Sequence, residues 1–106
     1  MDGRLECEVG EVRTDEPRPV FVRGEVDLAT ASDLEIAVRN ALDDAPAGVL
    51  LDMAQLTFID SSGLRALVAL AKDAESRRTK LALRNLPRHA QRVLELTGLG
   101  DWFEVT

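Results

Sequence analysis

Two adjacent serines, Ser61 and Ser62, follow an aspartate at the end of an apolar segment and precede a run with helical periodicity. This spacing predicts that they lie at a helix N-terminus, where unpaired backbone N–H groups and the positive end of the helix dipole converge. A serine hydroxyl there either caps the helix or accepts a phosphate, which would meet donors and a favourable field. Position alone leaves both roles open.

A hydrolase nucleophile is a third interpretation of Ser61. Such an enzyme needs a general base and usually a Gly-x-Ser-x-Gly turn, but Ile59 stands two positions before the serine. The one histidine, His89, falls in the first turn of another predicted helix, and nothing nearby in the sequence marks it as a paired base. We therefore expect His89 to be at the surface or partly packed, and we expect the protein not to be an enzyme.

The aspartates suggest two other kinds of chemistry. Residues 50–53 resemble the acceptor strand of an aspartyl-phosphate receiver, but no acidic pair follows the first strand and no lysine follows the last. Asp52 is instead expected to cap the strand end or to face solvent. Asp27 and Asp60 make a thin metal site without further ligands, so we expect no metal and no other cofactor. Their expected role is to orient a loop or to face a partner.

The spacing of apolar side chains predicts the elements that position these residues. Alternation over residues 5–9 and the apolar residues 20–22 predict two strands, hairpinned across a proline-containing turn at 14–19. Helical spacing predicts a helix over residues 31–43, opened by a capping-box arrangement of Thr30 and Asp33. Residues 49–53 are typical of a strand buried on both faces, and residues 81–83 predict another strand.

Two further helices follow from the same pattern. The helix after Ser61 has an inward stripe of six apolar residues: Leu64, Leu67, Val68, Leu70, Ala71 and Ala74. Another lies between Pro87 and a Gly98 cap, and residues 102–105 predict a last short strand. This order predicts one α/β domain over residues 1–106, with a mixed central sheet, a parallel core and crossover helices packed against it. The functional residues are expected in the loops beyond the carboxyl ends of the strands, where the loop at residues 24–27 should lie beside the loop at residues 58–63.

Composition narrows the classes of partner. The chain has 106 residues, is 45% hydrophobic and carries a net charge of −6, as expected of a soluble globular domain. A single cysteine, Cys7, excludes an internal disulfide. The cluster Arg77-Arg78-Thr79-Lys80 is expected to be a solvated helix end, because nucleic-acid binders concentrate more positive charge and single-strand binders add stacking aromatics. With no signal peptide or membrane-spanning run, we expect a cytoplasmic protein that binds neither nucleic acid nor membranes.

Four segments together carry a resemblance to a known family. They are Gly-Glu-Val-Asp at 24–27 with Thr-Ala at 30–31, Val-Leu-Leu-Asp at 49–52, Phe-Ile-Asp-Ser-Ser-Gly-Leu at 58–64 and Leu-Thr-Gly-Leu at 96–99. The chain resembles the STAS domain of bacterial anti-sigma factor antagonists from about residue 20 to residue 105. It departs from the family in its acidic-proline segment at 15–19 and in ending at Thr106, where many relatives continue into another helix.

The resemblance implies transcription regulation by partner switching, often in a stress response. In the family, the first serine of the motif is phosphorylated by a partner that is both serine kinase and anti-sigma factor, which carries over to Ser61. The unphosphorylated protein is expected to bind this kinase, and the phosphoprotein to be released until a phosphatase resets it. The expected partner-binding residues are Asp27, Asp60, Ser61, Ser62, Gly63, Arg65 and Ala69. An alternative role on the same fold is a scaffold subunit of a large stress-signalling assembly.

Two expectations about the energetics of this site accompany that assignment. Asp27 is expected to be an exposed loop carboxylate whose removal hardly changes stability. A phosphate on Ser61 is expected to be held by the first-turn amides of its helix, offsetting its proximity to Asp60.

Overall fold

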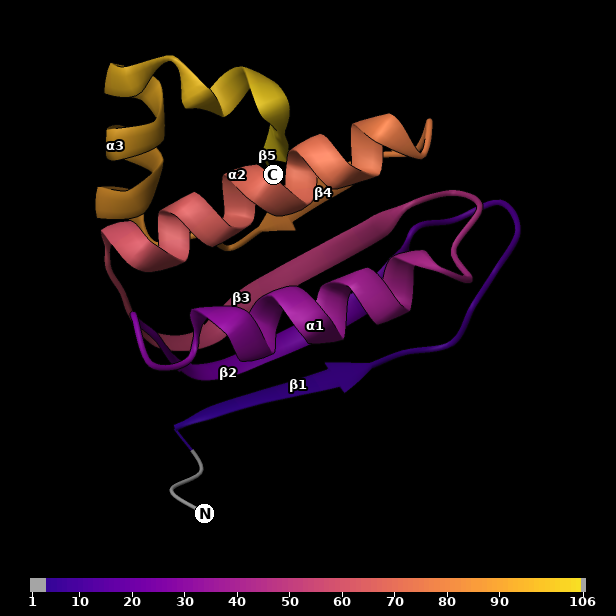
Figure 1. Ribbon diagram of the computed structural model, residues 1–106, viewed down its shortest axis with the longest axis horizontal. Coiled ribbons are helices and arrows are strands. Elements are labelled where there is room, and N and C mark those ends of the chain that lie inside the picture. The colour runs from indigo at the N-terminus through magenta and orange to yellow at the C-terminus, as the bar shows by residue number, and fades with distance from the viewer. Residues whose placement is uncertain (1–3, 106) are drawn as a thin grey trace.

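The computed structural model describes residues 4–105, which form a sheet with helices packed on it (Figure 1). In chain order the elements are β1 (Leu5–Val9), β2 (Arg18–Val26), α1 (Ala31–Leu42), β3 (Val49–Ile59), α2 (Ser61–Ser76), β4 (Leu81–Arg84), α3 (Arg88–Thr97), the 3-10 helix η1 (Leu99–Trp102) and β5 (Glu104–Val105). The sheet order is β1-β2-β3-β4-β5, with β1 antiparallel to β2 and the other neighbours parallel. The predicted mixed sheet with a parallel core is confirmed.

Helices α1 and α2 lie side by side along one face of the sheet (Figure 1). The core lies between them and the strands, and its largest fully buried side chains include Leu34, Leu51, Met53, Leu67 and Leu70. In the first half of β3, buried side chains alternate with the half-buried Leu50 and Asp52. The expectation that residues 49–53 are buried on both faces is therefore wrong, because the second face of the sheet is open to solvent here.

Both central strands are longer than their apolar runs predict. Strand β2 continues through Gly24, whose φ of +106° belongs to an irregularity where the register with β3 shifts. A Cβ at Gly24 would lie 2.0 Å from the Arg4 carbonyl oxygen, so only glycine fits this close approach. Residues 24–26 and 58–59, predicted to lie in loops, are consequently strand residues, as are residues 54–57. Their partly polar sequence hid them, because the outer half of β3 is largely exposed.

The helices agree more closely with the pattern of apolar residues. All six residues of the inward stripe predicted for α2 are buried. Pro87 precedes the first turn of α3, and Gly98 ends it with a left-handed φ of +74°, as predicted. The last strand is shorter than predicted, because Trp102 belongs to η1 and its ring lies under the Lys72 ammonium, 5.4 Å from the ring centroid.

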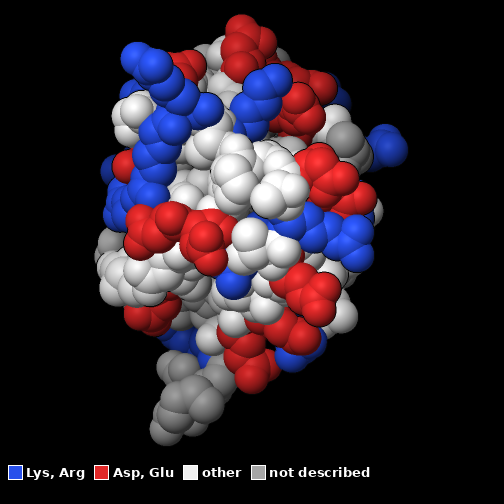
Figure 2. Space-filling view, turned by 90° about the vertical axis from the view of Figure 1, so that its right-hand side faces the viewer, with Lys and Arg blue, Asp and Glu red and all other residues white. Residues whose placement is uncertain are grey.

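The end of the molecule at the right of Figure 1 mixes charges of both signs. Figure 2 shows Lys and Arg interleaved with Asp and Glu on this surface. Arg77 forms ion pairs with Asp43 and with Asp73, the second at 3.0 Å, and Lys80 pairs with Glu104 at 3.5 Å. The basic cluster is thus partly neutralised by nearby carboxylates. In the described part of the chain, no helix is long and apolar enough to span a bilayer.

Candidate functional site

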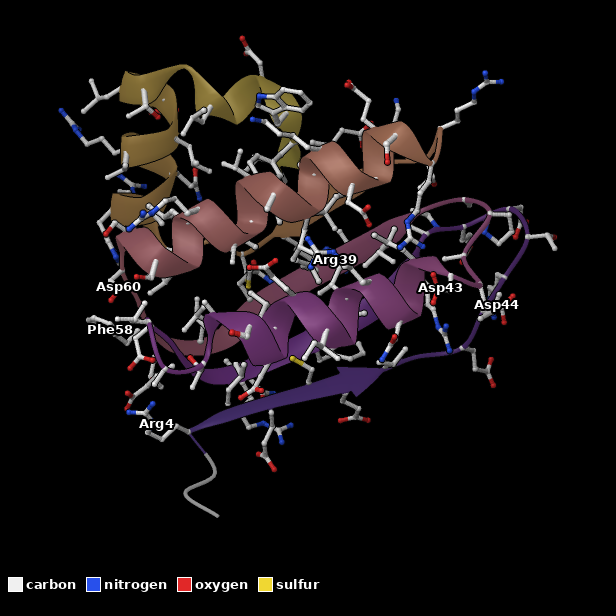
Figure 3. All side chains as sticks on the ribbon, viewed as in Figure 1. Arg4, Arg39, Asp43, Asp44, Phe58 and Asp60 are labelled. Carbon is white, nitrogen blue, oxygen red and sulfur yellow. The ribbon has the colours of Figure 1, made fainter. Side chains whose placement is uncertain are left out.

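The candidate site lies where β2 and β3 end. Val26 and Ile59 are register partners in the parallel pair, and the Asp60 N–H donates to the Val26 carbonyl at 3.3 Å. The turn after β2 therefore lies against the start of α2, as predicted from the topology. Figure 3 shows Asp60, Phe58 and Arg4 at this end of the molecule and the acidic pair Asp43 and Asp44 at the other.

The helix α2 is capped by Asp60. One carboxylate oxygen of Asp60 accepts hydrogen bonds from the Ser62 and Gly63 N–H groups, at 2.9 and 3.2 Å. The backbone of Asp60 is extended, and its carbonyl accepts the first helical bond from Leu64 N–H at 3.0 Å. This is an N-cap arrangement, so the interpretation of Ser61 or Ser62 as the helix cap is wrong.

Ser61, released from capping, presents its side chain to solvent. It is the first residue of α2 and is exposed, whereas Ser62 is half-buried. Neither hydroxyl makes a hydrogen bond within residues 4–105. An accessible, unbonded hydroxyl is what a modifying enzyme or a binding partner requires.

Gly63 lies beneath the site, where its lack of a side chain allows close packing. It is buried, and a Cβ added there would lie 2.6 Å from Ile59 Cγ1, 2.9 Å from Val26 Cγ1 and 3.0 Å from the Val26 carbonyl oxygen. The missing side chain lets α2 begin directly against the end of β2. Predicted to bind a partner, Gly63 is instead placed beneath the surface, where it fixes the position of its neighbours.

Asp27 is not the free loop carboxylate that the sequence suggested. Its Oδ1 accepts hydrogen bonds from Ala29 N–H at 2.9 Å and Thr30 N–H at 3.1 Å, and lies 3.5 Å from Arg4 Nη2. Partial desolvation acts to raise the pKa of Asp27, but the Arg4 guanidinium and the hydrogen bonds from Thr30 and Ala29 outweigh it and lower the pKa below the ordinary value. The side chain organises the turn between β2 and α1.

Thr30 completes this turn in a way that differs from the predicted capping box. Its hydroxyl donates to the Glu25 carbonyl at 2.8 Å and accepts from the Asp27 N–H at 3.0 Å, and it makes no capping bond to α1. The Asp27 carboxylate, three residues earlier, takes the Thr30 N–H instead. The turn is an Asx-type structure in which each of the two side chains accepts a hydrogen bond from the backbone N–H of the other residue.

A shallow hollow lies between α1 and α2, with Ser62 in its lining. It is lined by Leu28, Ala31, Ser32, Glu35, Ser62, Arg65, Ala66 and Ala69. Three of the predicted partner-binding residues meet there, namely Ser62, the exposed Arg65 and the half-buried Ala69. Sequence reasoning missed Leu28, whose side chain is 80% exposed. A large apolar residue directly after Asp27, in a turn between a strand and a helix, was the available signal.

Comparison with known proteins identifies this arrangement. A family model described as Mlab, STAS domain matches residues 9–105, which is nearly the whole chain. The chain belongs to the STAS domain family. An anti-sigma-B factor antagonist of Listeria monocytogenes is 32% identical to this STAS domain over 88 residues, covering 81% of this chain and 75% of the relative.

Solved structures agree with that assignment. An anti-sigma factor antagonist from Mycobacterium paratuberculosis has a TM-score of 0.78 at 27% identity, covering 95% of this STAS domain and 84% of that chain. SpoIIAA, solved in unphosphorylated and phosphorylated forms, shares the fold with TM-scores of 0.73 and 0.69 at 20% and 21% identity. The two comparisons cover 95% of this chain and 88% and 91% of SpoIIAA, respectively.

His89 and Asp52, the two other residues that the sequence brought up for catalytic chemistry, lie on α3 and β3. His89 is exposed on α3 and pairs with no carboxylate within residues 4–105. In the same part of the chain, no three His, Cys, Asp or Glu side chains gather closely enough to hold a metal ion. The Asp52 carboxylate accepts from Ala54 N–H at 3.0 Å and from Asn85 Nδ2 at 3.3 Å, so it links β3 to the segment after β4.

Proposed function

We propose that this STAS domain is an anti-sigma factor antagonist that works by partner switching. With Ser61 unmodified, it binds an anti-sigma factor that is also the serine kinase acting on Ser61, and so frees a sigma factor. Phosphorylated Ser61 ends the complex until a phosphatase removes the phosphate. The observation that carries the proposal is the exposed, unbonded Ser61 hydroxyl at the start of α2, next in sequence to Ser62, which lines the hollow of α1 and α2.

Two capped turns support this site by holding the edge rigid. Asp60 fixes the start of α2, and Asp27 fixes the turn before α1. A preorganised edge loses little conformational entropy when a partner docks, so binding energy is not spent on ordering the loops. In the proposal, the partner covers Ser61, the exposed Leu28 and the Arg65 side of α2.

Phosphorylation changes the charge of this edge sharply. A phosphoserine adds about −1.5 to −2 charges at pH 7, directly beside the Asp60 carboxylate and close to the Asp27 turn. A partner that accommodated the neutral hydroxyl against these carboxylates would meet like-charge repulsion, which costs several kcal/mol across an interface. The fold itself does not have to change for the partner to leave.

Affinity capture followed by site-directed variants tests the proposal. Capture on the purified domain should recover an ATP-binding anti-sigma factor, which with ATP should add one phosphate to Ser61 in peptide mapping. Ser61→Ala should keep binding in the presence of ATP, whereas Ser61→Glu should bind weakly. Asn40→Glu, an exposed change on α1 that adds the same charge, is the matched control and should bind normally.

The results that contradict the proposal are equally concrete. A phosphate placed solely on Ser62, or equal affinity of the Ser61→Ala and Ser61→Glu variants, would reject the switch. Recovery of a very large assembly of homologous STAS subunits in place of an anti-sigma factor would favour the scaffold role instead.

A further inference from the structure

Asp60 already engages three of the first four backbone donors of α2, and the fourth, the Ser61 N–H, makes no hydrogen bond within residues 4–105. The Ser62 and Gly63 N–H groups bond its carboxylate at 2.9 and 3.2 Å, and the Leu64 N–H bonds its carbonyl at 3.0 Å. A phosphate on Ser61 would therefore not find these amides free. The expectation that first-turn amides hold the phosphate therefore stays a prediction for the Ser61 N–H alone, and any further counter-charge would come from a side chain.

Arg65 stands where such a counter-charge is needed. It follows Ser61 by four residues on α2, so the two side chains share one face of the helix, with Cβ atoms about 5–6 Å apart. Both residues are exposed. An anion at position i with a cation at i+4 is the favourable order along a helix, and a guanidinium binds phosphate in bidentate fashion.

Arg65 is also the unengaged cation of the two helices that form the hollow. Arg39 on α1 pairs with Glu35 at 2.9 Å, and Lys72 on α2 lies over the Trp102 ring. Within residues 4–105, the Arg65 guanidinium makes neither an ion pair nor a hydrogen bond, although it lines the hollow together with Glu35. In the unmodified protein its charge is available to a partner.

We propose that a phosphate on Ser61 is bound within the same helix by Arg65, and that this contact withdraws Arg65 from the partner. The inference rests on the proposed function in taking Ser61 as the modified residue. It adds a second cause of release beside the like-charge repulsion at the interface, because the phosphorylated edge loses a cation as well as gaining an anion. Arg65 thus contacts the partner while Ser61 is unmodified and contacts the phosphate once Ser61 is phosphorylated.

Phosphorus NMR of a defined phosphoprotein tests the intramolecular contact without any partner. Phosphoserine is incorporated at position 61 during translation, and the second phosphate pKa, ordinarily near 6, is measured by titration at low ionic strength. Because a guanidinium favours the dianion, the phosphate pKa should be about half a unit lower with Arg65 than in the Arg65→Gln variant. Arg65→Lys should restore part of the shift, and high salt should reduce it.

Lys72→Gln is the matched control. It removes one positive charge from the same helix, at a position about 16 Å from Ser61 along the helix axis. It should leave the phosphate pKa unchanged. Equal phosphate pKa values in the parent protein and the Arg65→Gln variant, with both folded by circular dichroism, would overturn the contact. So would a shift of the same size in Lys72→Gln, because it would show a general charge effect.

Affinity measurements on the same proteins test the second half of the inference. Unphosphorylated Arg65→Gln should bind the captured anti-sigma factor at least about ten-fold more weakly than the parent, as expected for loss of a charged interface contact. Unchanged affinity would show that Arg65 does not contact the partner and would overturn the withdrawal. If phosphoserine at 61 leaves partner binding intact while its pKa still depends on Arg65, the switch fails and the contact stands.

Discussion

Replacing Gly63 with alanine tests how closely α2 packs on the end of β2. The added methyl group would lie 2.6 Å from Ile59 Cγ1 and 3.0 Å from the Val26 carbonyl oxygen, whereas comfortable contacts are about 3.5–4.0 Å. The Val26 carbonyl oxygen cannot move aside, because it belongs to a strand and also accepts the Asp60 N–H at 3.3 Å.

Two opposing effects set the magnitude of the change. Glycine to alanine inside a helix is worth up to about 1 kcal/mol in favour of the variant. Overpacking a dense site costs about 1–3 kcal/mol, and the rigid carbonyl places this site toward the upper end. We therefore expect Gly63→Ala to lower the free energy of unfolding by about 1–2 kcal/mol, with a fall in Tm of at least about 4 °C.

Thermal and urea unfolding followed by circular dichroism measure this loss. Gly100→Ala is the matched control, because its nearest atom, the Leu94 carbonyl carbon, would lie 3.8 Å from the new Cβ and its φ is not positive. That variant should have nearly the same free energy of unfolding as the parent. A Gly63→Ala protein equal to or more stable than the parent would refute the close packing that positions Ser61.

Three further changes test separate parts of the site and core. Asp60→Ala should lose about 1 kcal/mol of unfolding free energy through the missing N-cap, whereas Asp60→Asn, which keeps the acceptor oxygen, should lose much less in urea unfolding. Asp27→Asn should lower Tm at pH 6. Because the pKa of Asp27 is lowered in the folded state, this stabilisation is fully present above the unfolded-state pKa and is lost as pH falls through the folded-state pKa, so the Tm difference should shrink as the pH is lowered. Burial, helped by the charge of Asp33, raises the pKa of the Cys7 thiol from 9.0 to about 11, so iodoacetamide at pH 8 should alkylate the folded protein about a hundred-fold more slowly than the urea-unfolded chain.

Much of the fold was predictable because its apolar pattern is strong. The inward stripe of α2, the caps of α3 and the parallel core follow from side-chain periodicity and from Pro87 and Gly98. The outer half of β3 was not predictable in the same way. Residues 54, 55, 57 and 58 are exposed and Leu56 is only partly buried against the core, so this half of the strand shows no clear alternation of apolar and polar side chains.

The local chemistry of the site depended on contacts that sequence spacing does not reveal. The Arg4–Asp27 pair joins residues 23 positions apart through the antiparallel pairing of β1 with β2. The choice of Asp60 over Ser61 as the helix cap depends on one backbone conformation, since both residue types are good caps. That choice decides whether the Ser61 hydroxyl caps the helix or is available to a partner.

Titration calorimetry with defined proteins tests the central claim most directly. The captured anti-sigma factor is titrated with the unmodified domain and with the same domain carrying phosphoserine at 61, and both samples are first shown to unfold at similar temperatures. The switch requires the phosphorylated domain to bind at least about thirty-fold more weakly, matching the 2 kcal/mol or more that a mismatched interfacial charge costs. Affinities that agree within about two-fold would contradict the claim that Ser61 controls the complex.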